Sequence, residues 1–148
     1  MSSKKILSIR RKMGVMICKD FFFMNKSIYE NFSFFLKNLG WKKEIIKLKI
    51  NEVLSHINMS WASEKNMQSL SLGEKQKVFF ATSLLNDPAI FIADEPVANL
   101  DEKNSQEIFK ILENLNEKKV TIIVFSHNEN FIKEKYRVFS LEKKSFIQ

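Results

Sequence analysis

The chain is poor in several features that define large protein classes. A single cysteine, Cys18, cannot form an internal disulfide, which favours a reducing compartment. No apolar run approaches the roughly 20 residues of a membrane-spanning helix, and the opening Met1–Lys5 is not followed by the apolar segment of a secretory signal. No repeat, low-complexity tract or Pro/Gly/Ser-rich linker divides the chain. We therefore expect one cytosolic domain of 148 residues with its own hydrophobic core.

The charge balance is basic, with a formal net charge of +7. Clustered Lys and Arg would suit nucleic acid or an anionic membrane surface. Lysine supplies 21 of the 24 basic residues, however, and the lysines are dispersed along a chain that is also rich in Ile, Asn and Phe. This pattern favours biased composition over a phosphate-binding patch, and we expect no nucleic-acid partner.

The N-terminal half has helical periodicity. A short strand is predicted at 13–17, after which Ser27 and Glu30 have the spacing of a capping box. Apolar residues then recur every three or four positions in two successive segments, so residues 27–57 are predicted to form a helical hairpin. His56 falls just off the apolar face and is interpreted as a solvated side chain.

The C-terminal half predicts a strand, helix, strand unit. A helix is expected over about 74–85, followed by an apolar run at 89–93 that is too brief for a helix and is bounded by prolines. An amphipathic helix follows around 108–115, and the β-branched run 120–125 is of the kind buried on both faces in a parallel sheet. The tail, 137–147, predicts a small antiparallel hairpin.

Three polar side chains follow the two predicted strands. Because a parallel crossover places the carboxyl ends of both strands along one sheet edge, Asp94, Glu95 and His127 are expected to converge there. One carboxylate could hold Mg²⁺ and the other could orient or deprotonate an attacking water, while the imidazole could contact a terminal phosphate. Taken singly, each would more often be an ordinary polar residue at a strand end.

Residues 71–76 predict a helix N-terminus, whose free N–H groups and dipole attract phosphate. Ser71 is a good N-cap, and capping alone is the simpler interpretation. Asn99 and Asp101 are likewise candidate caps of the next helix, a role compatible with a catalytic one.

Four short sequence motifs occur in a fixed order, and together they support a functional role for the candidate residues above more strongly than any one motif does. Together they resemble the second half of an ABC-type ATPase nucleotide-binding domain. The signature motif is matched by LSLGEKQ, Walker B with its following glutamate by IFIADEP, the D-loop by ANLD and the switch histidine by SHN; they cover 70–76, 90–96, 98–101 and 126–128.

The resemblance implies an α/β fold: the C-terminal part of a P-loop NTPase domain, with a parallel sheet flanked by helices and a helical subdomain. Residues 1–148 would form a single partial domain, in which about 20–86 is the helical subdomain and about 87–148 the core sheet. ATP and Mg²⁺ are the implied cofactors. The implied site consists of Glu95 and His127 as catalytic residues, Asp94 as metal ligand, and Ser71, Gly73, Glu74, Gln76 and Asp101 as nucleotide-binding residues.

Within the family, residues 10–15 and 24–31 are most similar to the FtsE-type cell-division ATP-binding subunits. This resemblance implies an FtsX-like transmembrane partner, a homodimer of ATPase subunits, and a cytoplasmic location at the inner face of the plasma membrane. The partner's coupling helix would dock on Phe21–Phe23 and the helical hairpin, although core packing is the simpler interpretation for at least two of these phenylalanines. The lipoprotein-release ATPases are close relatives and a second candidate branch.

The sequence also departs from the family pattern. None of its three glycines precedes a lysine, so the Walker A loop is absent, and the resemblance predicts that the N-terminal portion of the domain is missing. Cys18 stands at the Q-loop glutamine, Leu72 at the first signature glycine and Thr82 at a usual arginine. These departures leave ATP hydrolysis undecided and suggest, as an alternative, a non-catalytic remnant that only docks on a membrane partner. A chromosome-maintenance ATPase lobe is a third alternative, disfavoured because no sustained heptad pattern is present.

Overall fold

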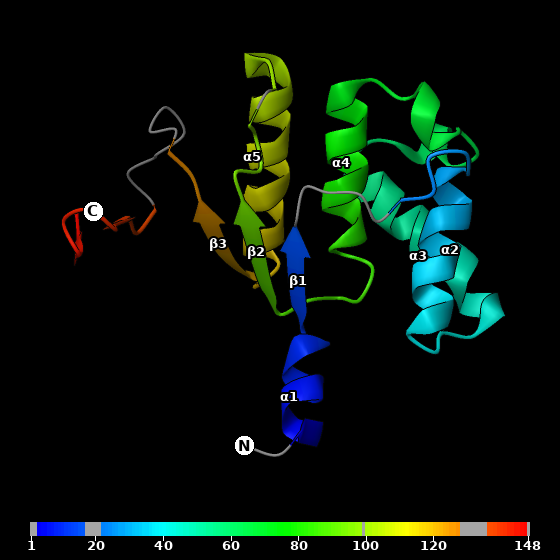
Figure 1. The fold of residues 1–148 in the computed structure, drawn as a ribbon, viewed down its shortest axis with the longest axis horizontal. Helices are drawn as coiled ribbons and strands as arrows, with labels where there is room; N and C mark the ends of the chain where they lie inside the picture. The colour runs from blue at the N-terminus through cyan, green and yellow to red at the C-terminus, as the bar shows by residue number, and fades with distance from the viewer. Residues whose placement is uncertain (1–2, 17–21, 99, 128–135, 148) are drawn as a thin grey trace.

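The computed structural model describes residues 3–16, 22–98, 100–127 and 136–147 (Figure 1). Its centre is a parallel sheet in the order β1-β2-β3, formed by β1 (Met13–Met16), β2 (Ile90–Asp94) and β3 (Thr121–Phe125). The register aligns Met13 with Ile90 and Ile90 with Thr121. The predicted strand, helix, strand unit is therefore confirmed as β2, α5 (Glu102–Glu117) and β3.

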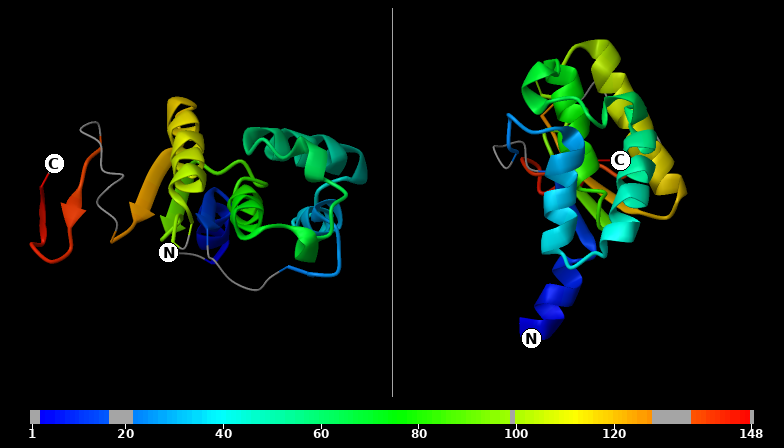
Figure 2. Two further views of the ribbon diagram at one scale, coloured as in Figure 1. Left: turned by 90° about the horizontal axis from the view of Figure 1, so that it is seen from above. Right: turned by 90° about the vertical axis from the view of Figure 1, so that its right-hand side faces the viewer.

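One face of the sheet is packed and the other is open. Phe91 and Ala93 of β2 are fully buried on the face that α5 covers, where Ile108 and Leu112 of the helix join the same core (Figures 1 and 2). On the opposite face Val15 is exposed, and Ile90 and Ile92 are half-buried. The sheet thus has one buried and one incompletely covered apolar face.

The prediction that 120–125 is buried on both faces is wrong. In β3, Ile123 and Phe125 are 42% and 48% exposed, while the alternate residues Ile122 and Val124 pack partly against the core. The β-branched composition gives the strand its conformation, but burial needs neighbours on both sides. Within the described ranges, β3 is an edge strand with the core on one side only.

The helical hairpin is confirmed as α2 (Ile28–Asn38) and α3 (Lys43–His56). Ser27 caps α2 in the predicted box: Glu30 N donates to Ser27 Oγ at 3.1 Å, and Ser27 N donates to Glu30 Oε2 at 2.9 Å. Both helices bury an apolar stripe, consisting of Ile28, Phe32, Leu36, Ile46, Ile50, Val53 and Leu54.

Two short 3₁₀ turns, η1 (Ser60–Ala62) and η2 (Met67–Ser69), lead from the hairpin to α4 (Leu72–Thr82). The helix predicted at about 74–85 thus begins and ends earlier than expected. In Figure 1, α2, α3 and α4 lie to the right of the three strands. α1 (Ser3–Arg10) extends away from the start of β1 (Figures 1 and 2). The strand predicted at 13–17 is confirmed as far as Met16.

The predicted C-terminal hairpin is confirmed. β4 (Phe139–Ser140) pairs antiparallel with β5 (Ser145–Phe146). Tyr136 Oη donates to Glu113 Oε1 at 2.6 Å, which attaches this segment to α5. None of the described helices is long and apolar enough to cross a membrane.

Candidate functional site

The carboxyl edge of the sheet is where the structure gathers the predicted catalytic side chains. β2 ends at Asp94, and the next residue, Glu95, has a φ of 46°, in the left-handed region that a β-carbon disfavours. Glu95 N donates to the carbonyl of Phe125 at 2.9 Å, so the turn is held against the end of β3. A non-glycine residue held in this region costs on the order of 1 kcal/mol and is typical of functional sites.

This turn aims the Glu95 carboxylate at His127. His127 N donates to Glu95 Oε1 at 2.9 Å, and His127 Nδ1 lies 2.7 Å from the same oxygen. Ser126 Oγ donates to Oε2 at 3.2 Å. Both carboxylate oxygens are therefore engaged by the segment after β3, and the predicted convergence of these two residues is observed.

These contacts set the charge state of Glu95. Partial burial raises the pKa of the carboxyl, but the hydrogen bonds from His127 and Ser126 lower it further than burial raises it. The net result is a pKa below the ordinary value, so Glu95 is an anion at neutral pH. An ionised carboxylate beside an imidazole can orient a water molecule and accept its proton.

Asp94 does not join this pair. Its side chain is exposed, and strand alternation places it on the same open face as Ile90 and Ile92. No hydrogen-bond partner is found for it in the part of the chain that the structure describes, which leaves its oxygens available to a cation. Nor do three His, Cys, Asp or Glu side chains come together among the described residues. Asp94 therefore fits the usual Mg²⁺ arrangement, in which one or two carboxylates act with substrate phosphates.

The signature residues form a second cluster, at the N-terminus of α4. Ser71 and Glu74 make a reciprocal capping box: Glu74 N donates to Ser71 Oγ at 3.3 Å and Ser71 N donates to Glu74 Oε2 at 2.7 Å. The predicted N-cap role of Ser71 is thus confirmed. The Glu74 carboxylate turns back onto its own helix.

Gly73 is buried where α4 meets α5. A β-carbon at this position would lie 2.9 Å from the side chain of Asn104, so a larger residue would force that side chain to move. Asn104 is in turn fixed by Asp101, the N-cap of α5, which accepts from Asn104 N at 2.8 Å and from Asn104 Nδ2 at 2.9 Å. The predicted signature and D-loop residues therefore meet through Asn104, a residue that sequence reasoning missed because its role depends on contact between two helices.

Gln76 is buried and bonded rather than open to solvent. Its Nε2 donates to the carbonyl of Pro96 at 3.0 Å, which ties α4 to the segment after Glu95. The side chain thus links the two clusters. Three other positions singled out from the sequence, Cys18, Asn99 and Asn128, lie outside the described residues.

His56 is not the solvated residue that its position predicted. It is half-buried, and its Nε2 lies 2.8 Å from Lys118 Nζ at the end of α5. Burial lowers the pKa of His56, and the Lys118 charge lowers it further. The long reach of Lys118 from a separate helix is the reason that helical periodicity did not reveal the contact.

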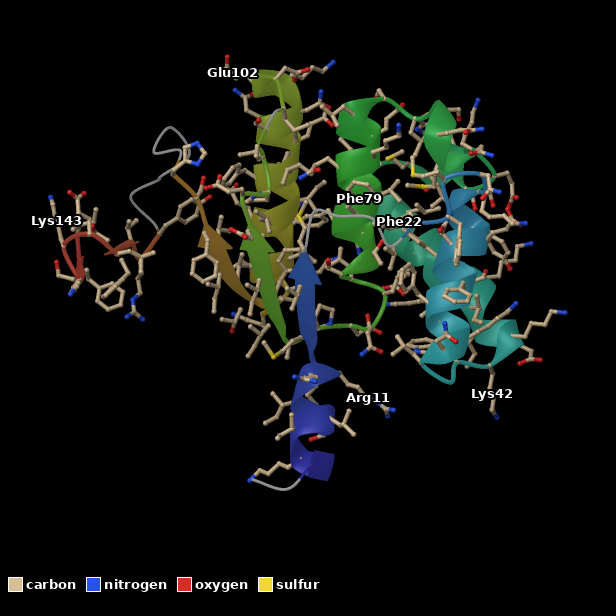
Figure 3. The ribbon with its side chains drawn as sticks, in the orientation of Figure 1. Arg11, Phe22, Lys42, Phe79, Glu102 and Lys143 are labelled. Atoms are coloured by element: carbon tan, nitrogen blue, oxygen red, sulfur yellow. The ribbon has the colours of Figure 1, made fainter. Side chains whose placement is uncertain are left out.

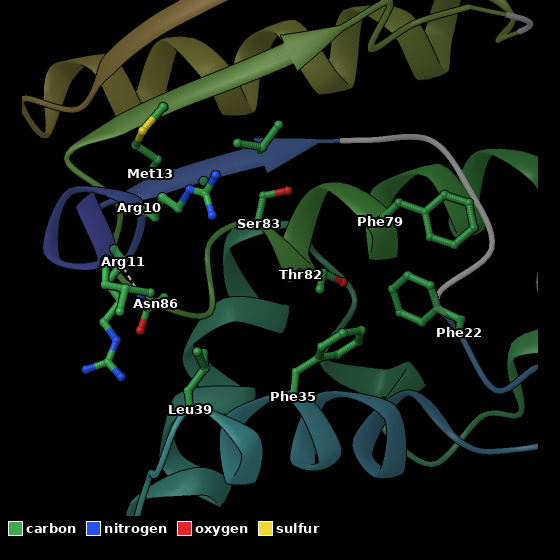
Figure 4. A pocket seen from close by; sticks show the side chains of 13 residues that line it. Arg10, Arg11, Met13, Phe22, Phe35, Leu39, Phe79, Thr82, Ser83 and Asn86 are labelled. Atoms are coloured by element: carbon green, nitrogen blue, oxygen red, sulfur yellow. Dashed lines mark hydrogen bonds between the residues drawn. The ribbon is translucent and has the colours of Figure 1, made fainter. Parts of the chain in front are cut away.

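A cavity of about 550 Å³ opens between α1, β1, α2 and α4 (Figure 4). One side is aromatic: the Phe22 ring lies 5.8 Å from that of Phe35 and 4.9 Å from that of Phe79 between centroids. Arg10 and Arg11 line the other side. Of the three phenylalanines predicted as a docking site, Phe22 faces this cavity, Phe23 is exposed and packs on Phe34 at 5.2 Å, and Phe21 is outside the described residues.

Comparison with known proteins gives a consistent result. The sequence profile described as "ABC transporter" matches residues 1–98. The cell division ATP-binding protein FtsE of Bacillus subtilis is 36% identical over 141 residues, 94% of this chain and 61% of that protein. The methionine import ATP-binding protein MetN of Bifidobacterium longum is 30% identical over 90% of this chain and 34% of that protein. The chain thus spans less than two thirds of either relative.

Solved structures agree with this assignment. cbiO1 of Clostridium perfringens, part of the ABC transporter complex cbiONQ, superposes with a TM-score of 0.76 at 28% identity, over 86% of this chain and 51% of that one. An ATP-binding cassette in a dimeric post-hydrolysis state, bound to ADP and Pi, gives a TM-score of 0.73 at 26% identity, over 88% of this chain and 59% of that one. The fold is therefore the α/β fold of these P-loop ATPases, and the chain belongs to the ABC transporter ATP-binding family.

Proposed function

We propose that this chain acts as the ATP-binding subunit of an FtsE-type membrane complex, in which ATP hydrolysis is coupled to a membrane-spanning, FtsX-like partner during cell division. The observation that supports this proposal most directly is the Glu95–His127 pair at the carboxyl edge of the sheet, next to the exposed carboxylate of Asp94. The 36% identity with FtsE of Bacillus subtilis supports the choice of branch. The complex would lie on the cytoplasmic face of the membrane.

The roles follow from the charges and contacts at the site. Asp94 would hold Mg²⁺ together with phosphate oxygens of ATP, and the metal would neutralise charge on the transferred phosphoryl group. Glu95, held ionised, would orient the attacking water and accept its proton. His127 would contact the terminal phosphate through the ring nitrogen that does not face Glu95.

Nucleotide binding requires a phosphate-binding segment that the described residues do not supply. Gly14 and Gly73 both serve close packing, against Ser83 and Asn104, rather than a loop around phosphate. The open sheet face beside β3 offers a place for the missing segment, because parallel sheets are normally covered on both faces. We propose that this segment corresponds to the part of FtsE that lies outside the match.

The arrangement of the two clusters supports a homodimer. Ser71 at the start of α4 and the Glu95–His127 pair at the sheet edge are both exposed or half-exposed. A nucleotide between two copies would be contacted by the signature residues of one copy and by the catalytic pair of the other. The structural relative bound to ADP and Pi is itself described as dimeric, which supports this assembly.

The cavity lined by Phe22, Phe35 and Phe79 would receive the membrane partner. Its aromatic wall suits the apolar side of a short helix, since aromatic rings contribute large buried areas at interfaces. Docking there would join the partner to α2 and α4, and α4 carries the signature residues. A movement of the partner would thus reach the nucleotide site through α4.

The test is Mg²⁺-dependent ATP hydrolysis by the chain mixed with the N-terminal segment of Bacillus subtilis FtsE that carries the phosphate loop. We expect hydrolysis that Glu95→Gln abolishes while ATP binding is retained, because the amide cannot accept a proton. The matched control is Glu142→Gln in the exposed C-terminal hairpin, which should leave hydrolysis unchanged. Equal activity of the two variants would contradict the assigned role of Glu95.

A non-catalytic docking protein is the second candidate. It is favoured by the close packing of Gly14 and Gly73, because neither glycine is free to form a loop around phosphate. Under this alternative, the added FtsE segment would restore neither ATP binding nor hydrolysis. The chain would still co-purify with FtsX in membranes, and Phe79→Ala in the cavity would abolish that association.

A further inference from the structure

The positive charge of this protein is concentrated at its N-terminal end. The segment 1–19 contains six basic residues and no acidic residue, and the first carboxylate of the chain is Asp20. Nearly all of the net charge of +7 therefore comes from this segment, whereas acidic and basic residues are almost balanced in the rest. The dispersed distribution assumed from composition does not hold here.

The structure presents this charge on a projecting helix. α1 extends from the N-terminal end of β1 away from the rest of the molecule (Figures 1 and 2). The basic residues Lys5, Arg10, Arg11 and Lys12 are all exposed. Within the described ranges none of these four side chains forms an ion pair. Three lysines elsewhere do: Lys26 pairs with Glu30 at 2.9 Å, and Lys49 and Lys77 also have carboxylate partners.

The same helix exposes aliphatic side chains among the basic ones. Leu7 is 56% exposed, and Ile6 and Ile9 are also exposed. Apolar side chains next to unpaired cations are the composition of segments that lie at the interface of an anionic bilayer, where the aliphatic groups enter the acyl boundary and the cations stay at the headgroups. A nucleic-acid backbone would satisfy the charges but leave the aliphatic groups bare.

The position of α1 also separates it from the nucleotide site. α1 precedes β1 and therefore lies at the amino edge of the sheet, whereas Glu95 and His127 lie at the carboxyl edge. Its cations are thus not placed to hold nucleotide phosphates. Leu7, Arg10 and Arg11 instead line the cavity proposed for the membrane partner, so the basic helix and that cavity share one side of the molecule.

We propose that α1 and Lys12 form a second interaction surface, which binds anionic phospholipid headgroups directly. The basic side chains attract the lipid phosphates, and Leu7 and its aliphatic neighbours insert beside them. This contact adds to docking on a protein partner and does not depend on ATP hydrolysis. Each basic residue near an anionic surface strengthens binding by about fivefold at low salt, and the gain decreases as salt screens the charges.

The experiment is sedimentation of the chain with vesicles of phosphatidylglycerol and phosphatidylcholine in equal parts, and with phosphatidylcholine vesicles alone. We expect binding to the anionic vesicles only, weakened by added salt. Arg10→Glu/Arg11→Glu should reduce binding at least about tenfold. The control Lys42→Glu/Lys43→Glu makes the same charge change at two exposed residues at the start of α3, and should change binding less than about twofold. Figure 3 shows Arg11 and Lys42 on different parts of the molecule.

A third variant separates lipid from nucleic acid. Leu7→Gln should weaken vesicle binding about fivefold while leaving any binding to double-stranded DNA unchanged, because only the bilayer takes up the aliphatic group. Equal losses in the α1 and α3 charge variants, or equal binding to both vesicle types, would overturn the proposal. DNA binding as strong as vesicle binding at the same salt would identify a nucleic-acid surface instead. Far-ultraviolet circular dichroism verifies that each variant is folded.

Discussion

Replacing Gly14 with alanine should destabilise this protein strongly. Gly14 lies in the middle of β1, and a β-carbon built there would be 2.3 Å from the carbonyl oxygen of Ser83 and 3.0 Å from Pro88 Cγ. Non-bonded carbon and oxygen atoms do not approach this closely, so either β1 or the loop after α4 must move by about 1 Å. The contact with Ser83 involves backbone, which cannot rotate away as a long side chain could.

Several contacts oppose that movement. β1 pairs with β2 along its whole length, from Met13 to Met16, and Ala89 N donates to the carbonyl of Lys12 at 2.8 Å. We therefore expect Gly14→Ala to lower the free energy of unfolding by about 3 kcal/mol, at the upper end of the usual overpacking range. For a chain of this length that change corresponds to a fall in Tm of about 10 °C.

The assay is urea and thermal unfolding followed by circular dichroism, with Gly40→Ala as the matched control. Gly40 has a φ of 85°, and among the described residues no atom beyond its two chain neighbours lies within 4 Å of the point that a β-carbon would occupy. Alanine there should therefore cost only backbone strain, about 1 kcal/mol. If Gly14→Ala were no more destabilising than Gly40→Ala, the close approach of β1 to Ser83 would be refuted.

Two further predictions concern the site. Gln76→Ala removes the buried amide that donates to the Pro96 carbonyl and should cost about 1–2 kcal/mol of unfolding free energy, whereas Gln106→Ala, on the exposed surface of α5, should cost much less; urea unfolding measures both. The pKa of Glu95 is lowered in the folded state, so its contribution to stability is present above the unfolded pKa of about 4.3 and is lost as pH falls through the folded pKa. Because Glu95 is about one third exposed, this pH-dependent contribution to the free energy of unfolding should stay below about 1 kcal/mol. Urea unfolding at neutral and acidic pH should show the contribution in the parent protein and not in Glu95→Gln. An unchanged pH profile in Glu95→Gln would contradict the Glu95–His127 contact.

Local features of the fold could be predicted because neighbouring residues decide them. The capping boxes at Ser27 and Ser71 are set by a side chain and a backbone N–H three residues apart. Strand β2 was recognisable from a short apolar run between prolines, and the parallel crossover then required Glu95 and His127 to meet at one edge.

Other features depend on residues distant in sequence and could not be predicted in the same way. Gln76 belongs to the signature string, yet its partner is the carbonyl of Pro96, 20 positions later. Asn104 carries no motif signal, and its importance lies in the space beside Gly73. The exposure of Phe125 follows from the edge position of β3 and not from its composition.

The sequence by itself determined the family, the type of most helices and strands, and the identity of the paired carboxylate and imidazole, because these depend on motif order and on contacts within one turn or one strand. Only the tertiary structure decided that Asp94 stands apart on the open face, that Gln76 is a buried link, and that the basic residues of α1 remain unpaired within the described part of the chain. The physical reason is the same for all three: burial and pairing are set by what packs against a side chain, and those neighbours come from segments that sequence periodicity does not bring together.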